Sequence, residues 1–166
     1  MLVDKYPWLL DLNFLTMLIR TALAIICAGL IGFERGVHGS AAGMRTHILV
    51  CLGAMFAMAT GIFTSLYYDA DAERIGAQVV SGIGFLGAGT IIVHRGHISG
   101  LTTAAGLWAS ACIGLAFGAG FYEAGIIGTL AVLLVIRGLR NMAKNLQRVN
   151  TDEDPSVQNE EDTAGL

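Results

Sequence analysis

Long apolar stretches separated by short polar connections dominate the first 136 residues of the chain. Five of them approach the roughly 20 residues that a helix needs to cross the hydrocarbon core of a bilayer. They cover residues 14–33, 47–67, 75–93, 101–118 and 121–136. The bilayer core offers no water to satisfy free peptide groups, so these stretches must be helical. The pattern predicts an all-α polytopic membrane bundle of about five transmembrane helices rather than a water-soluble domain.

The composition supports this class of protein and isolates an acidic tail. Apolar residues make up 54% of the chain and charged residues only 14%, whereas soluble domains average about 25% charged residues. The net charge is -3, but six of the thirteen acids lie in the last sixteen residues, which contain no base. We therefore expect residues 150–166 to form a disordered acidic tail. Residues 137–149 read as a basic cytoplasmic helix at the anionic inner leaflet.

The basic residues predict how the chain is oriented. With the N-terminus outside, the outer segments hold only Lys5 and Arg74. The cytoplasmic segments then hold seven bases: Arg35, Arg45, Arg95, Arg137, Arg140, Lys144 and Arg148. This excess favours an N-out, C-in topology and an odd number of spans. Asp4 and Asp11 interrupt any basic leader, so we expect the first helix to be retained rather than cleaved as a signal.

The first cytoplasmic connection, residues 32–47, is the preferred functional region. Its polar patch consists of Glu34, Arg35, Arg45, Thr46 and His47. The arginines could hold lipid phosphates or pair with the carboxylate of Glu34. A divalent metal site is an open alternative, because Glu34 and His38 have i, i+4 spacing and the next cytoplasmic connection supplies His94 and His97.

Polar groups also occur at membrane depth, where a charged side chain costs about 2.5–3.5 kcal/mol on insertion scales. Arg20 lies inside the outer end of the first span, and Glu123 lies near the outer end of the fifth. We predict that they come within ion-pair reach; the alternative is that Arg20 snorkels outward. Interhelical hydrogen bonding, or a small polar cavity, would account for the uncharged polar residues Gln78, Ser81, Thr102 and Thr103.

Small residues recur at helical spacing in three of the predicted spans. Gly82, Gly84 and Gly87 form a literal GxGxxG, but no carboxylate follows at the distance that a dinucleotide site needs. Close helix packing accounts for them better. The predicted small-residue faces are Ala77, Ser81, Gly84 and Ala88; Ala24, Ala28 and Gly32; and Gly106, Ser110, Gly114 and Gly118.

Three segments carry a family resemblance: IGFERGVHGSAAGMRTHILVCLGA, RIGAQVVSGIGFLGAGTII and ISGLTTAAGLWASACIGLAFGAG. In this order they resemble the MgtC/SapB family of bacterial membrane proteins over residues 14–136. The resemblance implies an inner-membrane location, a role in magnesium limitation and acid stress, and an inhibitory contact with ATP synthase. The short acidic tail indicates a form without the family's soluble C-terminal domain. The matched motif residues are Glu34, Arg35, Gly43, Arg45, Thr46, His47, Gln78, Ser81, Gly82, Gly84, Thr102, Thr103 and Trp108.

The expected function is therefore non-enzymatic. We expect no catalytic residue and no cofactor, and we expect membrane lipid, a second copy as a homodimer and a membrane protein such as ATP synthase as partners, without nucleic acid. The alternative is a small channel or transporter for an ion or small solute. The spans offer only Glu34 and Glu123 as carboxylates, which argues against a dedicated magnesium pore. A membrane-bound hydrolase is the least supported reading, because Thr46 and His47 point about 100° apart on a helix.

Overall fold

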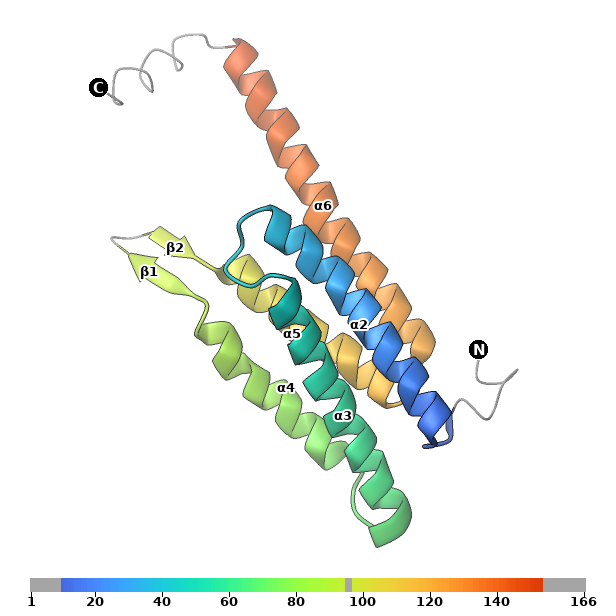
Figure 1. Cartoon of the computed structure of the whole chain (residues 1–166). Helices are drawn as coiled ribbons and strands as arrows, with labels where there is room; N and C mark the ends of the chain where they lie inside the picture. Colours follow the sequence, from blue (N-terminus) through green and yellow to red (C-terminus); the bar gives the residue numbers. More distant parts are fainter. Residues whose placement is uncertain (1–9, 95–96, 154–166) are drawn as a thin grey trace. The chain divides into compact units, whose positions relative to one another are not determined.

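The computed structural model of the chain describes residues 10–94 and 97–153, with side chains described for residues 10–94 and 98–138. Five long helices and one small hairpin form it (Figure 1). In chain order they are α2 (Phe14–Val37), α3 (Met44–Tyr68), α4 (Glu73–Ala88), β1 (Ile92–His94), β2 (His97–Ser99), α5 (Leu101–Gly118) and α6 (Tyr122–Glu153). The predicted all-α class is confirmed. The chain divides into two compact units, Met1–Val132 and Leu133–Leu166, and the packing described below belongs to the first.

Local sequence signals set the ends of several helices. A capping box starts α2: the side chain of Asn13 accepts a hydrogen bond from the Thr16 amide at 3.0 Å, and Thr16 returns one to the Asn13 amide. Gly100 precedes α5 with φ +88°, and a Cβ there would collide with the carbonyl oxygen of Thr90. Only glycine fits this turn, which delivers the chain from the hairpin into α5.

Helix α5 lies at the centre of the first unit and packs against α2, α3 and α4. Small residues allow this close packing, as predicted for the first and fourth spans. Ala24, Ala28 and Gly32 are buried on α2. The corresponding α5 face is buried as well and consists of Gly106, Ser110, Gly114 and Gly118. Where side chains are this small, helix backbones approach closely and dispersion contacts hold them together.

Large apolar side chains lie on the outside of the bundle. Phe14 is 86% exposed, Phe85 is 84% exposed and Leu49 is 69% exposed. Soluble monomers rarely expose contiguous apolar surface on this scale. Three of the described helices, α2, α3 and α5, are also long and apolar enough to cross a bilayer. Small residues inside and large apolar residues outside are what a helical membrane bundle requires.

The structure corrects the predicted end of the third span, residues 75–93. Helix α4 stops at Ala88, and Ile92–His94 pair with His97–Ser99 in an antiparallel hairpin. The reason is local: Gly89 has a low helix propensity, and the Thr90–Val93 segment consists entirely of β-branched residues, which favour extended backbone.

The C-terminal prediction is also only partly right. The fifth span and the basic segment 137–149 are one continuous helix, α6, which runs on to Glu153. Residues 150–153 are therefore helical rather than disordered, and residues 154–166 of the predicted tail lie outside the described residues. The N-out, C-in orientation stays a prediction.

Candidate functional site

The predicted polar patch divides between two sides of the bundle. Glu34 is 6% exposed and His47 is fully buried, and both face the interior together with part of Arg35. Arg45 and Thr46 lie on the exposed side of α3. Neighbouring residues on a helix point about 100° apart, so the start of α3 cannot direct all three of its patch residues inward. The candidate site is therefore the inner set, Glu34, Arg35 and His47, with the α5 side chains that it meets.

Arg35 joins the end of α2 to the start of α5. Its Nη2 donates a hydrogen bond to Thr103 Oγ1 at 3.0 Å, and Thr103 is only 3% exposed. Arg35 is the basic residue in the last turn of α2, where a cation interacts favourably with the helix dipole. Thr103, which the sequence offered only as an intramembrane polar group, thus belongs to the site. Its neighbour Thr102 is exposed.

His47 joins the start of α3 to the middle of α5. A 2.8 Å hydrogen bond connects its Nδ1 to Ser110 Oγ, and both residues are fully buried. A Cβ at Gly106 would lie 3.2 Å from His47 Cε1, so the glycine makes room for the ring. Within the described part of the chain, His47 Nε2 is buried without a hydrogen-bond partner. Burying this atom without a partner costs free energy of desolvation.

Glu34 and His38 interact within α2. Nδ1 of His38 lies 2.7 Å from the Glu34 carbonyl oxygen and 3.6 Å from its carboxylate Oε1. Among residues 10–94 and 98–138, no three His, Cys, Asp or Glu side chains gather as a metal site. The side chain of His97 lies outside the described residues. The metal alternative therefore gains no support from the geometry of α2.

Arg20, at the other end of α2, forms a second buried polar junction. Its Nη1 donates to the Gly118 carbonyl at 2.7 Å, its Nε to Tyr122 Oη at 3.3 Å and its Nη2 to the Leu10 carbonyl at 3.2 Å. Arg20 is 1% exposed, which argues against the alternative that its side chain snorkels outward. It satisfies a carbonyl in the last turn of α5, where the helix dipole favours a cation. The ion pair with Glu123 stays a prediction.

The glycines predicted to pack helices also divide into two groups. Gly87 contacts Ala104, Gly106 contacts His47 and Gly114 lies against the α3 backbone at Cys51. At Gly82 and Gly84, by contrast, an added Cβ would meet no other described part of the chain within 4 Å. The whole face formed by Ala77, Ser81, Gly84 and Ala88 is exposed, together with Gln78. The described helices of this chain do not pack on that face, since the inner face of α4 is Gly76, Ile83 and Gly87, and the close approach of another helix there stays a prediction.

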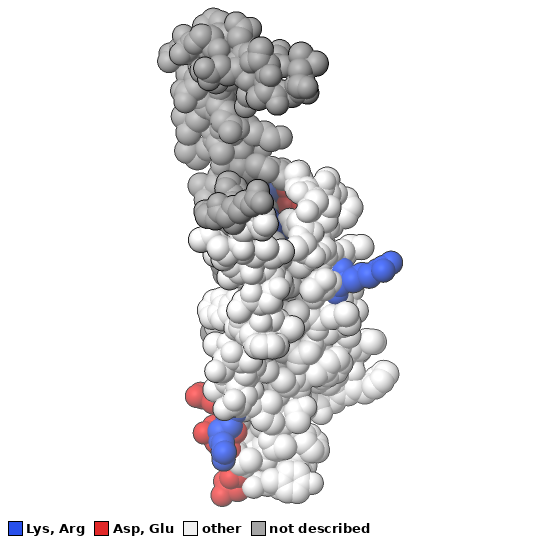
Figure 2. All heavy atoms as spheres, turned by 90° about the vertical axis from the view of Figure 1, so that its left-hand side faces the viewer, with Lys and Arg blue, Asp and Glu red and all other residues white. Residues whose placement is uncertain are grey.

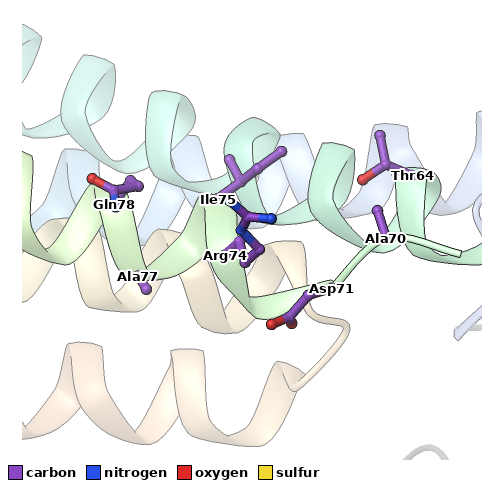
Figure 3. A pocket seen from close by; sticks show the side chains of 7 residues that line it. All are labelled: Thr64, Ala70, Asp71, Arg74, Ile75, Ala77 and Gln78. Carbon is purple, nitrogen blue, oxygen red and sulfur yellow. The ribbon is translucent and has the colours of Figure 1, made fainter. Parts of the chain in front are cut away.

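A groove runs between α3 and α4 on this side of the bundle. Its middle section has a volume of about 370 Å³ and is lined by apolar residues that include Gly53, Ala54, Gly82 and Leu86. A second hollow of about 570 Å³ lies where α3 turns into α4, and Figure 3 shows Asp71, Arg74 and Gln78 around it. The groove is thus apolar, and the hollow at the α3–α4 turn adds the charged residues Asp71 and Arg74 to a mainly apolar lining.

Two functional contacts were not anticipated from the sequence. Ser110 was placed only in a small-residue ladder, although it is the partner of His47, and Tyr122 was not singled out at all. A signal existed for Ser110, since a buried histidine needs a hydrogen-bonding partner and a serine in a neighbouring span can supply one. Nothing in the spacing of Arg20 and Tyr122, 102 residues apart, indicates that they meet.

Comparison with known proteins decides the family. The sequence profile of the MgtC family matches residues 21–145, which include all the residues of the candidate site on α2, α3 and α5. The chain belongs to the MgtC family. In this MgtC-family bundle, the loop motif supplies Arg35 and His47, and the fourth-span motif supplies Thr103. Two of the three segments that carry the resemblance therefore meet in space across α2, α3 and α5.

Individual relatives agree with this assignment. The chain is 41% identical over 139 residues to the Escherichia coli protein named "Putative magnesium transporter YhiD", an alignment that covers 80% of this chain and 65% of the relative. It is 42% identical over 125 residues to "Protein MgtC" of Brucella abortus, covering 75% of this chain and 51% of the relative. The chain thus spans between half and two thirds of the length of these relatives. No solved structure matches it.

Proposed function

We propose that this MgtC-family protein is a non-enzymatic, multi-pass regulator of ion homeostasis in the bacterial inner membrane, acting when magnesium is limiting. Membership of the family and the magnesium-related name of the Escherichia coli relative support the link to magnesium. The family resemblance further suggests a role in acid stress and a membrane protein such as ATP synthase as the partner.

One structural observation carries the choice of a regulator over a transporter. The guanidinium of Arg35 and the imidazole of His47 hold α2 and α3 on α5. They do so through hydrogen bonds to Thr103 and Ser110. Such interhelical hydrogen bonds fix the arrangement of a bundle. On this proposal the motif maintains the shape of a membrane surface that other proteins recognise.

A growth assay tests the regulatory role. The gene is expressed in a bacterium that lacks its own MgtC-family protein, and growth is followed in medium with limiting magnesium. We expect the wild-type chain to restore growth and R35A to fail, because the tie to Thr103 is lost. R45A is the matched control: it removes the same charge from the exposed side of α3 and should restore growth. Equal growth of the two variants would contradict the role assigned to Arg35.

Magnesium transport is the second candidate, favoured by the name of the Escherichia coli relative and by the carboxylate of Asp71 in the hollow at the α3–α4 turn. Mg²⁺ usually keeps several waters and binds through one or two carboxylates, so a single Asp is a minimal site. Purified protein in liposomes loaded with a magnesium indicator separates the candidates. Flux that exceeds empty liposomes and falls in D71N would establish transport; growth rescue without flux supports the regulator. Co-purification with ATP synthase from the rescued cells, lost in R35A, tests the suggested partner.

A further inference from the structure

The outer face of α4 is unusual for a surface that touches lipid. Ser81 and Gln78 are exposed there together with Gly82, and Phe85 projects from the same side with 84% of its surface exposed. A lipid-facing helix has no reason to place an amide, a hydroxyl and a glycine together on one exposed surface, whereas helix interfaces are enriched in such residues. Figure 2 shows the middle of this side of the molecule as largely uncharged, with an acidic and basic cluster at one end and a projecting basic side chain in the other half.

This surface contains both a projection and a recess. The recess is the apolar groove between α3 and α4, where Gly53 and Gly82 leave open space on opposite walls. The projection is Phe85, one turn along α4 from Gly82. A two-fold symmetric interface needs both on the same surface, because each copy must offer what the other accepts.

The α3–α4 turn carries one acidic and one basic side chain, so each copy offers a charge of either sign to the other. Asp71 and Arg74 both line the hollow at the α3–α4 turn (Figure 3). Within the described residues, Asp71 Oδ1 accepts a hydrogen bond from the Glu73 amide, and the guanidinium of Arg74 has no hydrogen bond or ion pair. Two copies related by a two-fold axis along the bilayer normal would set Arg74 of each against Asp71 of the other.

The length of α4 gives an independent reason for association. With 16 residues it spans about 24 Å at a rise of about 1.5 Å per residue, which is short of the roughly 30 Å hydrocarbon core. A span shorter than the membrane is accommodated by local thinning of the bilayer or by oligomerisation. Covering the short helix with a second protein copy removes part of its boundary with lipid.

We propose that a second copy of this chain docks on the groove between α3 and α4. The interface is two-fold symmetric: Phe85 of each copy enters the groove beside Gly53 and Gly82 of the other, and Arg74 pairs with Asp71 across the rim. It rests on the proposed membrane placement of α4 and is independent of the role in magnesium limitation.

Cysteine cross-linking in native membranes tests the placement of the interface. Ser81 lies on the face to be covered, so S81C should form a disulfide-linked dimer under mild oxidation. The wild-type chain gives the background from its own cysteines, of which Cys27 and Cys51 are buried and Cys112 is half-buried. I26C is the matched control, a mid-helix position on α2 that is 57% exposed but lies away from the groove. Cross-linking of I26C at the level of S81C would show random collision and overturn the proposal, as would no cross-linking of S81C.

Steric blocking tests the same surface without relying on disulfide chemistry. In S81C/G82L a leucine stands in the wall of the groove, at a position where no other described part of the chain lies within 4 Å, so the fold has room for it while a second copy does not. We expect its cross-linking yield to fall at least five-fold. S81C/G138L, with a leucine at another helical glycine in open space, should keep the full yield. Equal yields in the two variants, with both chains melting at the S81C temperature, would refute the interface.

A charge exchange tests the pairing at the rim. Copies carrying D71R and copies carrying R74D each place like charges opposite one another in a homodimer. When the two are co-expressed with different tags, every cross-pair becomes attractive. We expect at least three-fold more mixed dimer than either homodimer at low salt, and a random mixture would overturn the pairing. Cross-linking without growth rescue would overturn only the proposed function, and growth rescue without cross-linking only the interface.

Discussion

Replacing Gly32 by alanine should destabilise the bundle by forcing α2 away from α3. A Cβ at this position would lie 2.5 Å from Met44 Cα and 3.0 Å from both the Gly43 carbonyl oxygen and His47 Cβ. Two of these atoms belong to backbone, which cannot rotate out of the way as a side chain can. Ordinary contact begins near 3.4 Å, so the helices must separate by about 0.9 Å at this point. The separation would also disturb His47 and its bond to Ser110.

The neighbouring glycine on α2 provides a control for the size of this effect. A Cβ at Gly36 would lie 3.8 Å from Gly43 Cα, an ordinary contact. Glycine-to-alanine replacement within a helix by itself stabilises by about 0.5–1 kcal/mol, and both variants share this gain. Overpacking costs about 1–3 kcal/mol. The difference between G32A and G36A therefore isolates the steric cost, and we expect it to be about 2 kcal/mol.

Thermal unfolding in detergent measures this difference. A fluorogenic thiol dye reports unfolding, because Cys27 and Cys51 are buried in the folded chain, while the half-buried Cys112 sets a baseline common to all variants. For a domain of this size about 2 kcal/mol corresponds to roughly 4–8 °C in Tm. We expect G32A to melt below the wild type and G36A at or above it. Equal melting temperatures for G32A and G36A would show that α2 and α3 do not approach at Gly32 as described, and the reasoning would fail.

Three further substitutions test the polar junctions with the same melting assay. R20M should lower the free energy of unfolding by about 3 kcal/mol or more, because the Gly118 carbonyl and the other acceptors of Arg20 lose their buried charged donor. A stability equal to that of the wild type would contradict the junction. S110A should lower the free energy of unfolding by about 1–3 kcal/mol, since His47 Nδ1 stays buried without its partner. An unchanged stability would mean that the ring has another hydrogen-bond partner. T103V removes the acceptor of Arg35 and should lose about 1–2 kcal/mol, while T102V, at an exposed position, should change stability by less than about 0.5 kcal/mol.

The sequence by itself determined the number of long helices, the membrane class and the family. Peptide groups in hydrocarbon must form their hydrogen bonds within their own segment, so a long apolar stretch predicts a helix of similar length. The sequence did not determine the ends of the helices as well. Mean hydropathy does not separate the apolar, β-branched residues after Gly89 from the helix before them, and α4 ends there because of local backbone preference.

The tertiary structure decided which side of each helix faces inward. In a soluble protein polarity marks the outer face, but lipid and a membrane-protein interior are both apolar, so periodicity carries little information about facing. Small-residue ladders therefore looked alike in three spans, yet the ladders of α2 and α5 are buried and that of α4 is exposed. The polar contacts were undetermined for the same reason. Arg20 could have paired with any group at its depth, and only the packing of α5 against α2 brought it to Gly118.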